Sequence, residues 1–302
     1  MTIDLALTSL SQGLLWAIMA IGIHTTYRIL DFADLSAEGS FTLGGAVTAR
    51  FITTGMDPVL SILLSILAGA IAGLITGALH TQLKIPPLLS GILTMTGLYS
   101  VNLRIMFGKA NIPLMKATTI MTKFSKYGLG KREASIVVGI ICIIIVILIL
   151  WWFYNTEIGY AIRATGNNEN MIKAQGVNTN VMKMLGLVIG NALVAFSGSL
   201  LTQYNGYADV GMGIGTIVIG LASVIIGEVV FSDKNSHKVF FSVVLGSILY
   251  RLIISFVLSC GLSPNDLRGI SSILLAICLY LPTFREKISR TKMGRLLNRK
   301  EG

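Results

Sequence analysis

Two carboxylates lie at the beginning of an apolar stretch, close enough in sequence to act together on a cation or a polar solute. Asp34 and Glu38 are four residues apart, so a helix would present both side chains on one face. Acids inside a membrane commonly line a polar path or bind a cation. The alternative is that they cap the start of a helix at the membrane edge, where negative charge is stabilising. The nearby Arg28 favours this alternative, and both interpretations stay open.

Arg251 is a single positive charge in the middle of another apolar stretch, FFSVVLGSILYRLIISFVLSC. An unpaired charge there costs on the order of several kcal/mol, so Arg251 should face protein, a cavity or a carboxylate. A structural ion pair is the favoured interpretation, and contact with a substrate is the alternative.

The remaining reactive residues do not form an enzyme site. The three histidines are scattered without an HExxH motif, and the three cysteines lack the spacing of metal ligands. No GxxxxGK[ST] loop is present, so the chain does not hydrolyse nucleotides by that machinery. We therefore expect no catalytic residue, no metal site and no cofactor bound by this chain. Any coupling to ATP must come from a partner.

The elements that position these residues are helices in a membrane. The chain has 302 residues, of which 53% are hydrophobic and 13% charged, against about 25% charged in soluble domains. Its mean hydropathy is +0.76, and stretches of about 20 apolar residues recur. This predicts an all-α fold, a polytopic bundle of about 8–10 transmembrane helices. We place nine spans, at residues 5–27, 34–51, 58–80, 87–103, 134–153, 184–204, 210–229, 239–258 and 266–282.

Two of the nine spans are expected to be broken or re-entrant. The second opens with the two acids and is rich in glycine, and the seventh begins with the sequence GMGIG. Irregular backbone at membrane depth is tolerated only where protein or a cavity surrounds it. Gly39, Gly44 and Gly45 would let the second span pack closely along a translocation pathway.

A short internal similarity links these two spans. The tripeptide Phe-Ala-Asp ends at Asp34, and the tripeptide Tyr-Ala-Asp ends at Asp209. Gly45 and Gly220 then follow at the same offset. Spans 1–4 would repeat as spans 6–9 in the opposite orientation, with the fifth span as connector, which is a device of transporters. The identities are few, so chance is the alternative.

The distribution of charge orients the bundle. The net charge is +10, and seven basic residues in the last 18 favour a cytoplasmic anchor over a nucleic-acid-binding tail. Residues 157–183 then lie inside and residues 104–133 outside. The outer segment holds seven basic residues, a departure from the positive-inside rule that longer translocated loops allow. We interpret the chain as one transmembrane domain, residues 1–284, followed by a basic cytoplasmic tail, residues 285–302, with no nucleic-acid partner.

The inner segment 157–183 is longer and more structured than a simple connection. It is polar and rich in Gly and Asn, whereas the apolar spans on both sides carry no charge. Its pattern predicts an amphipathic turn with Ile158 and Ile162, a break at Gly-Asn-Asn, a short helix over residues 169–175 and a stop at Gly176. Such an element would dock a partner at the membrane surface, and a solvated loop is the alternative.

This segment resembles the permease subunits of bacterial ABC importers of the branched-chain amino acid and ribose type. Their pattern, G-x-A-x-R-A-x-G-x-N and then A-x-x-x-G-[IV]-[ND], is matched here by Gly159, Ala161, Arg163, Ala164, Gly166, Asn168, Ala174, Gly176, Val177 and Asn178. In that family the loop carries the coupling helix, which sits in a groove of the ATPase subunit. The resemblance implies that coupling is carried by Arg163, Ala164, Gly166, Asn167, Asn168, Ala174 and Gly176.

The N-terminal run SQGLLWAIMAIGIHTTYRILDFADLSAEGSFTLGGAV resembles the permeases of the tryptophan/tyrosine-type ABC systems. The resemblance covers nearly the whole chain and implies import of a small solute, an aromatic amino acid such as tryptophan or tyrosine. Selectivity in such importers is largely set by a separate binding protein, so the resemblance bears on the substrate less directly than on the mechanism.

The resemblance also implies the partners of the chain. Two copies would form the pathway in the bilayer, and a cytoplasmic dimer of ABC ATPases would carry ATP and Mg. A substrate-binding protein or lipoprotein would deliver the solute from outside, and transport would proceed by alternating access. The chain is thus expected in the bacterial cell membrane, as a multi-pass protein with a cytoplasmic C-terminus.

Several single residues are candidates for these roles. Those of the translocation pathway are Asp34, Ser36, Glu38, Gly39, Asp209 and Arg251. Those for docking the binding protein, chosen by charge alone, are Lys109, Lys116, Lys123 and Lys126. The alternative function is a secondary transporter driven by an ion gradient, which the inverted repeat and the two acids would fit. A channel-like or scaffold membrane protein is a third.

Overall fold

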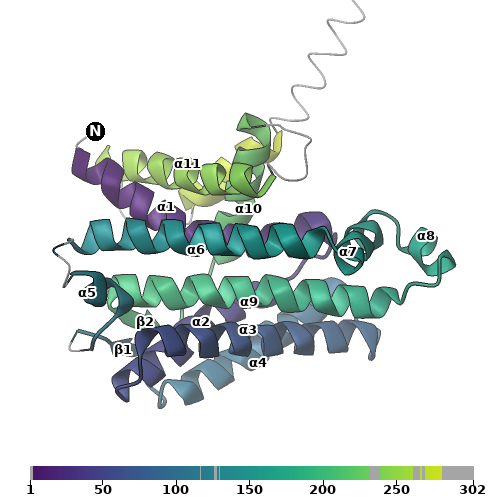
Figure 1. Cartoon of the computed structure of the whole chain (residues 1–302), viewed down its shortest axis with the longest axis horizontal. Helices are drawn as coiled ribbons and strands as arrows, with labels where there is room; N and C mark the ends of the chain where they lie inside the picture. The colour runs from purple at the N-terminus through teal and green to yellow at the C-terminus, as the bar shows by residue number, and fades with distance from the viewer. Residues whose placement is uncertain are drawn as a thin grey trace, which may run out of the picture.

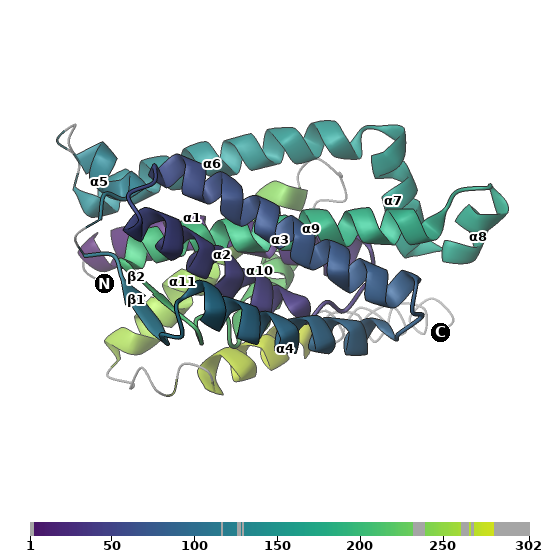
Figure 2. The same cartoon turned by 90° about the horizontal axis from the view of Figure 1, so that it is seen from below.

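The computed structural model describes residues 3–115, 117–125, 128, 130–231, 239–260, 266 and 269–280. Its long helices pack into one bundle (Figures 1 and 2). They are α1 (Ile3–His24), which continues into the π-helical turn η1 (Thr25–Ile29), α2 (Ser36–Thr53), α3 (Pro58–Thr81), α4 (Pro87–Ile105), α6 (Lys131–Tyr154), α9 (Thr179–Asn205), α10 (Thr216–Val230), α11 (Val239–Ser259) and a last helix (Gly269–Tyr280). The shorter elements are β1 (Asn111–Pro113), α5 (Ile120–Ser125), α7 (Glu157–Asn167), α8 (Glu169–Ala174) and β2 (Tyr207–Asp209).

Each of the nine predicted spans coincides with a helix, so the predicted all-α bundle is confirmed. Five of the described helical stretches are long and apolar enough to cross a membrane, namely Asp4–Ile29, Pro58–Thr81, Lys131–Tyr154, Thr179–Asn205 and Val239–Ser259. α10 and the last helix are apolar but shorter. A small antiparallel sheet, with β1 paired to β2, is not predicted by the sequence. Its strands have three residues each and lie far apart along the chain, so no local pattern reveals it.

Short polar residues start several of the helices. The carboxylate of Asp57 accepts the N–H of Val59 at 2.8 Å, and a proline follows it in the first turn of α3. The side chain of Asn178 caps the start of α9, where it accepts the N–H of Asn180 at 3.1 Å. These caps set the points where polar segments end and long apolar helices begin.

Glycines bring the helices of the bundle together around α9, which contacts α1, α2 and α3. A Cβ on Gly44 of α2 would collide with the backbone oxygen of Ala195 in α9, and one on Gly73 of α3 with that of Leu187. Helices in lipid gain little from the hydrophobic effect, so they depend on such close backbone approach. The predicted close packing of the second span is therefore confirmed at Gly44.

The contacts between the described helices are those expected of an internal repeat in which each half packs on the first helix of the other half. α2 and α3 both contact α9, whereas α10 and α11 both contact α1. α2 packs on α3 as α10 packs on α11, and α1 and α9 contact each other. The matched glycines follow the same rule, since Gly45 lies against Thr202 of α9 and Gly220 against Ile23 of α1. This exchange favours duplication over chance.

The two spans expected to be irregular begin inside the bundle. α2 itself is continuous from Ser36, so its irregular backbone lies before the helix and not within it, and Asp34 belongs to that preceding loop. α10 begins only at Thr216, after Gly215 with a φ of 83°. In the two matched turns, Asp34 and Asp209 each accept the N–H of the residue two positions later. In the irregular backbone before α2, Leu30, Phe32 and Asp34 are buried, whereas Asp31 and Ala33 are exposed. The surrounding protein that membrane-depth backbone requires is therefore present along part of this loop.

Candidate functional site

The polar segment 157–183 folds into two short helices at one end of the bundle (Figure 1). Thr156 caps α7, since its Oγ1 accepts the N–H three residues on at 3.3 Å. Asn168 caps α8, since its Oδ1 accepts the N–H of Met171 at 3.0 Å. Gly176, with a φ of 84°, stops α8. The predicted helix, short helix and glycine stop are confirmed. The break is confined to Asn168, because Gly166 and Asn167 lie within α7. The docking role stays a prediction.

Two of the predicted coupling residues anchor α7 to the bundle. A Cβ on Gly166 would collide with the backbone oxygen of Ile29 in η1, so only glycine allows this approach. The guanidinium of Arg163 lies 5.0 Å from the centre of the buried Tyr154 ring, a cation–π contact with the end of α6. Ile162, the residue before Arg163 in α7, is fully buried. α7 is therefore seated firmly on the bundle.

Glu169, which is not among the predicted coupling residues, anchors α8. Its carboxylate pairs with Lys173 at 2.8 Å and with Lys183 of α9 at 2.8 Å, and it accepts the hydroxyl of Thr179 at 3.1 Å. Hydrogen bonds from Lys173, then Lys183, lower the pKa of Glu169 from 4.5 to about 2. The spacing of four residues to Lys173 was a local signal for one of these pairs. The pair with Lys183 exists only because α8 folds back on α9.

The outer side of α7 and α8 remains open. Of the other predicted coupling residues, Asn167, Asn168, Ala174 and Gly176 are exposed and Ala164 is half-buried. Beside them, Tyr160 and Met171 are 57% and 48% exposed. Large apolar side chains among polar ones mark an interaction surface. The predicted coupling residues thus divide into anchors and an exposed face, and the large apolar Tyr160 and Met171 of that face are not among the predicted residues.

A second polar site lies inside the bundle, where α2 begins. Asp34 Oδ1 accepts the N–H of Ser36 at 2.9 Å and also its hydroxyl, and Oδ2 accepts Nδ2–H of Asn191 at 2.6 Å. Asp34 is buried, and no ion pair to it is found within the described ranges. Asp34 therefore holds the N–H of Ser36, the first residue of α2, from one position before the N-cap residue Leu35. The acid stands at the start of a helix, as the alternative interpretation predicts, but inside the bundle and not at its edge. Its bond to Asn191 ties the start of α2 to α9.

Glu38 holds the start of α10 against α2. Its Oε1 accepts the N–H of Gly215 at 2.8 Å, and Oγ1 of Thr42 accepts the N–H of Gly213 at 3.1 Å. The free N–H groups that precede a helix favour a carboxylate at this place. Both acids thus accept hydrogen bonds from backbone N–H groups at the starts of these two helices. Their part in a translocation pathway stays a prediction.

The remaining pathway candidates are not gathered around these acids. Gly39 packs against Leu98 of α4, where a Cβ would lie 2.9 Å from Cδ1 of that leucine. Asp209 ends β2, where its Oδ1 accepts the N–H of Gly211 at 2.8 Å. The matched tripeptides therefore lie in separate places and do not form one shared site.

Arg251 packs on α1 and not on an acid. Its Nη1 donates to Oε1 of Gln12 at 3.4 Å, and its guanidinium lies 4.2 Å from the centre of the Trp16 ring. The favoured ion pair is not found in the part of the chain that the structure describes. A cation–π contact with a neighbouring helix takes its place, because the ring and the amide are the groups that α1 presents there.

The lysines proposed for docking have different surroundings. Lys109 is exposed. Lys123 pairs with Asp57, and this hydrogen bond lowers the pKa of Asp57 below its usual range. Lys123 is thus already engaged within the chain, which weakens its candidacy. Lys116, Lys126 and the basic tail, residues 285–302, lie outside the described residues.

Comparison with known proteins now identifies the family. The family described as "branched-chain amino acid transport system / permease component" matches residues 5–281, nearly the whole chain. The chain belongs to this family of permeases. The match confirms the resemblance to the permease subunits of ABC importers and makes the chain a transport subunit.

Individual relatives agree with this assignment. The permease is 42% identical over 284 residues to the tyrosine transport system permease protein of Clostridioides difficile (strain R20291), covering 94% of this chain and 92% of that protein. It is 29% identical over 267 residues to the ribose import permease protein RbsC of Bacillus subtilis (strain 168), covering 88% and 78%. The structure of PsaBC from Streptococcus pneumoniae in complex with Fab matches with a TM-score of 0.50 at 16% identity, covering 92% of this chain and 90% of that chain. This last likeness is one of fold alone.

Proposed function

We propose that this permease is the membrane-spanning subunit of an ATP-binding-cassette importer whose substrate is an aromatic amino acid, tyrosine or tryptophan. The observation that carries the proposal is the α7–α8 segment, which is locked onto η1 and α9 on one side and exposed on the other. An element that is anchored to the bundle and exposes Tyr160 and Met171 is suited to bind an ATPase and to transmit its movement. The likeness to a tyrosine transport permease supports the substrate class.

In this mechanism, movement of the ATPases displaces α7 and α8, and two contacts pass the displacement into the bundle. Gly166 packs closely against the backbone of Ile29 in η1, the turn that continues α1. Glu169 holds α8 on α9 through Lys183. Because α9 is also hydrogen-bonded to Asp34, a shift of α9 moves the start of α2. Alternating access then arises from rocking of packed helices as stiff units.

The proposal also orients the permease in the bacterial cell membrane. The end with α7 and α8 is cytoplasmic, where two ATPases carry ATP and Mg. Residues 104–133, with β1 and α5, face outside, where a substrate-binding protein or lipoprotein delivers the solute. The exposed Lys109 is the described lysine best placed to meet acidic groups on that protein. A second copy of the chain completes the pathway.

Co-purification tests the assignment to an ATP-driven importer. An affinity-tagged chain, isolated in mild detergent from cells that express it natively, should retain an ATPase subunit identifiable by mass spectrometry. Reconstituted in liposomes, the complex should hydrolyse ATP faster when the substrate-loaded binding protein is added. Absence of an ATPase, together with uptake that needs a proton or sodium gradient, would establish the secondary transporter in its place.

The substrate needs a separate measurement on the binding protein that docks with the permease. Tyrosine and tryptophan should bind it more tightly than leucine or ribose, in calorimetric titrations under one buffer condition. Tighter binding of leucine or ribose would overturn the aromatic substrate and leave the importer assignment intact.

A further inference from the structure

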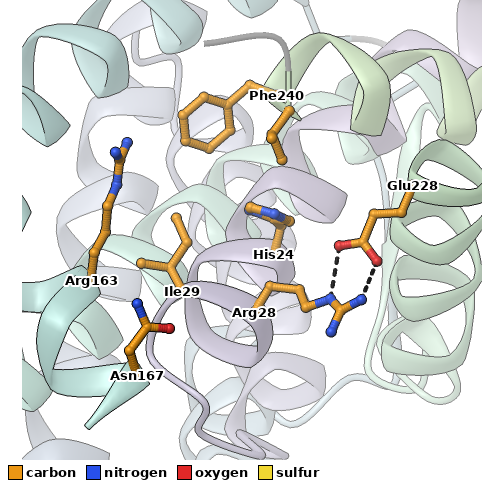
Figure 3. A pocket seen from close by; sticks show the side chains of 8 residues that line it. His24, Arg28, Ile29, Arg163, Asn167, Glu228 and Phe240 are labelled. Atoms are coloured by element: carbon orange, nitrogen blue, oxygen red, sulfur yellow. Dashed lines mark hydrogen bonds and ion pairs between the residues drawn. The ribbon is translucent and has the colours of Figure 1, made fainter. Parts of the chain in front are cut away.

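A cavity of about 300 Å³, with charged side chains in its wall, lies where the end of α1, η1, α7, α10 and α11 meet, at the proposed cytoplasmic end (Figure 3). Arg163 and Asn167 of α7 line one side of it, and Arg28 with Glu228 of α10 lines the other. His24 lies between them in Figure 3. Five elements supply this lining, namely α1, η1, α7, α10 and α11, so the cavity exists only in the folded chain.

The charged side chains among the described residues that line the cavity, Arg28, Arg163 and Glu228, sum to one positive charge. Arg28 donates to both carboxylate oxygens of Glu228, with Nε to Oε1 at 2.8 Å, so that pair is neutral. Arg163 makes a cation–π contact with Tyr154 and has no ion pair within the described ranges. A guanidinium on an aromatic ring keeps its N–H donors free at its edge. Arg163 is therefore able to bind an anion.

His24 supplies a second and independent sign of a ligand. It is 5% exposed and lines the same cavity, and its Nδ1 is buried without a hydrogen-bond partner. Buried polar atoms in folded proteins nearly always have a partner, because leaving one unsatisfied is destabilising. A group with several oxygen atoms inside the cavity would provide that partner and would also accept from Arg163.

We propose that this cavity binds one phosphate group, carried by an anionic phospholipid headgroup or by inorganic phosphate. Arginine matches phosphate oxygens with two parallel N–H donors. A single negative charge neutralises the excess, and the apolar Ile29 and Phe240 in the wall suit the glycerol carbons of a headgroup. Basic pockets between helices on the cytoplasmic side of membranes commonly bind such headgroups. The proposal depends on the proposed function only for its cytoplasmic orientation.

Occupancy of this site would regulate the coupling segment. The phosphate would bridge Arg163 of α7 to the bundle beside Gly166, the residue that seats α7 on η1. An occupied site therefore holds α7 more firmly, and an empty site loosens it. The permease would thus couple best in a membrane, or at a phosphate concentration, that keeps the site filled.

The test is thermal stabilisation of the purified full-length chain in detergent, at constant ionic strength. The probes are a short-chain phosphatidylglycerol, inorganic phosphate and, as the zwitterionic control, a short-chain phosphatidylcholine. Saturating phosphatidylglycerol should raise Tm by about 2–5 °C, and phosphatidylcholine should not. An equal rise with inorganic phosphate assigns the site to the free ion. An equal rise with phosphatidylcholine overturns the charge argument.

Variants of the chain locate the effect. Arg163→Gln should abolish the rise relative to its own ligand-free Tm, and Lys84→Gln should keep it. Lys84 is exposed and does not line the cavity, and it lies in the connection between α3 and α4, which is at the same end of the bundle as α7 (Figure 2). Asn167→Asp places an added carboxylate at the cavity and should also abolish the rise, which keeps the test valid if Arg163→Gln does not fold. No rise with any probe, or a rise that Arg163→Gln retains, overturns the proposal. The measurement involves neither an ATPase nor transport, so its failure is distinct from failure of the proposed function.

Discussion

At the scale of single residues, Gly166 and Gly176 are both matched to the coupling motif but are glycine for different reasons. Gly166 lies where a Cβ would meet the backbone oxygen of Ile29. Gly176 has free space around it and a φ of 84°, which most side chains rarely adopt. The first position requires close approach, and the second requires a left-handed turn at the end of α8.

Substitutions at these two glycines should therefore separate their roles. Gly166→Ala should push α7 away from η1, at a cost of about 1–3 kcal/mol, and lower the substrate imported per ATP hydrolysed. Gly176→Asn should leave that ratio near the unaltered value, because asparagine tolerates a positive φ. The ratio is measured in proteoliposomes that contain the whole complex. An equal loss in both variants would contradict the distinction.

At the scale of elements, the contacts between helices decide which glycines are needed. Gly44 of α2 meets the backbone of α9, whereas Gly97 of α4 has nothing within 4 Å of a built Cβ. The two residues look alike in the sequence, since both lie in glycine-containing apolar helices. The density of glycine predicts close packing in general, and only the arrangement of the helices shows where it occurs.

The same substitution at these positions should have opposite results. Gly44→Ala should force α2 and α9 apart and destabilise the chain by about 1–3 kcal/mol. Gly97→Ala should leave stability unchanged or raise it by up to about 1 kcal/mol, because alanine is the better helix former. Thermal denaturation of the two variants in the same detergent measures the difference. A lower Tm for Gly97→Ala than for Gly44→Ala would show that the α2–α9 contact is not required.

At the scale of the whole molecule, the two ends of the bundle carry different structures. One end holds α7 and α8, and the other holds α5 and the β1–β2 sheet (Figure 1). α2 and α10 begin inside the bundle and run toward opposite ends. α2 ends beside the start of α3, and α10 ends where Glu228 pairs with Arg28. The proposed repeat therefore relates two halves that face opposite sides of the membrane.

Cysteine labelling should show which end faces outside. In a chain from which the three native cysteines are removed, Lys109→Cys should react with a membrane-impermeant maleimide in intact cells. Asn170→Cys, at an exposed position on α8, should react only after permeabilisation. The basis is the excess of basic residues in the proposed cytoplasmic segments. The reverse pattern of labelling would invert the topology and contradict the cytoplasmic placement of α7 and α8.

The sequence by itself determined the class of fold, the places of the nine helices and the outline of the coupling segment. These features depend on local properties, namely runs of apolar residues, capping side chains and glycine stops, which act over a few turns of the chain. Asn168 and Gly176 illustrate this, since each acts on its own helix end.

Only the tertiary structure decided which polar groups meet. Asn191 bonds to Asp34 across 157 residues, and Arg28 to Glu228 across 200. Such pairs were not predictable, because helices that are apolar nearly all round carry little periodicity to show which face is inward. The sequence likewise predicted that the charge of Arg251 would have a partner. Only the packing against α1 shows that this partner is the ring of Trp16, in a cation–π contact. Composition and local pattern thus build the helices, and close packing, which depends on residues far apart in the chain, assembles the sites.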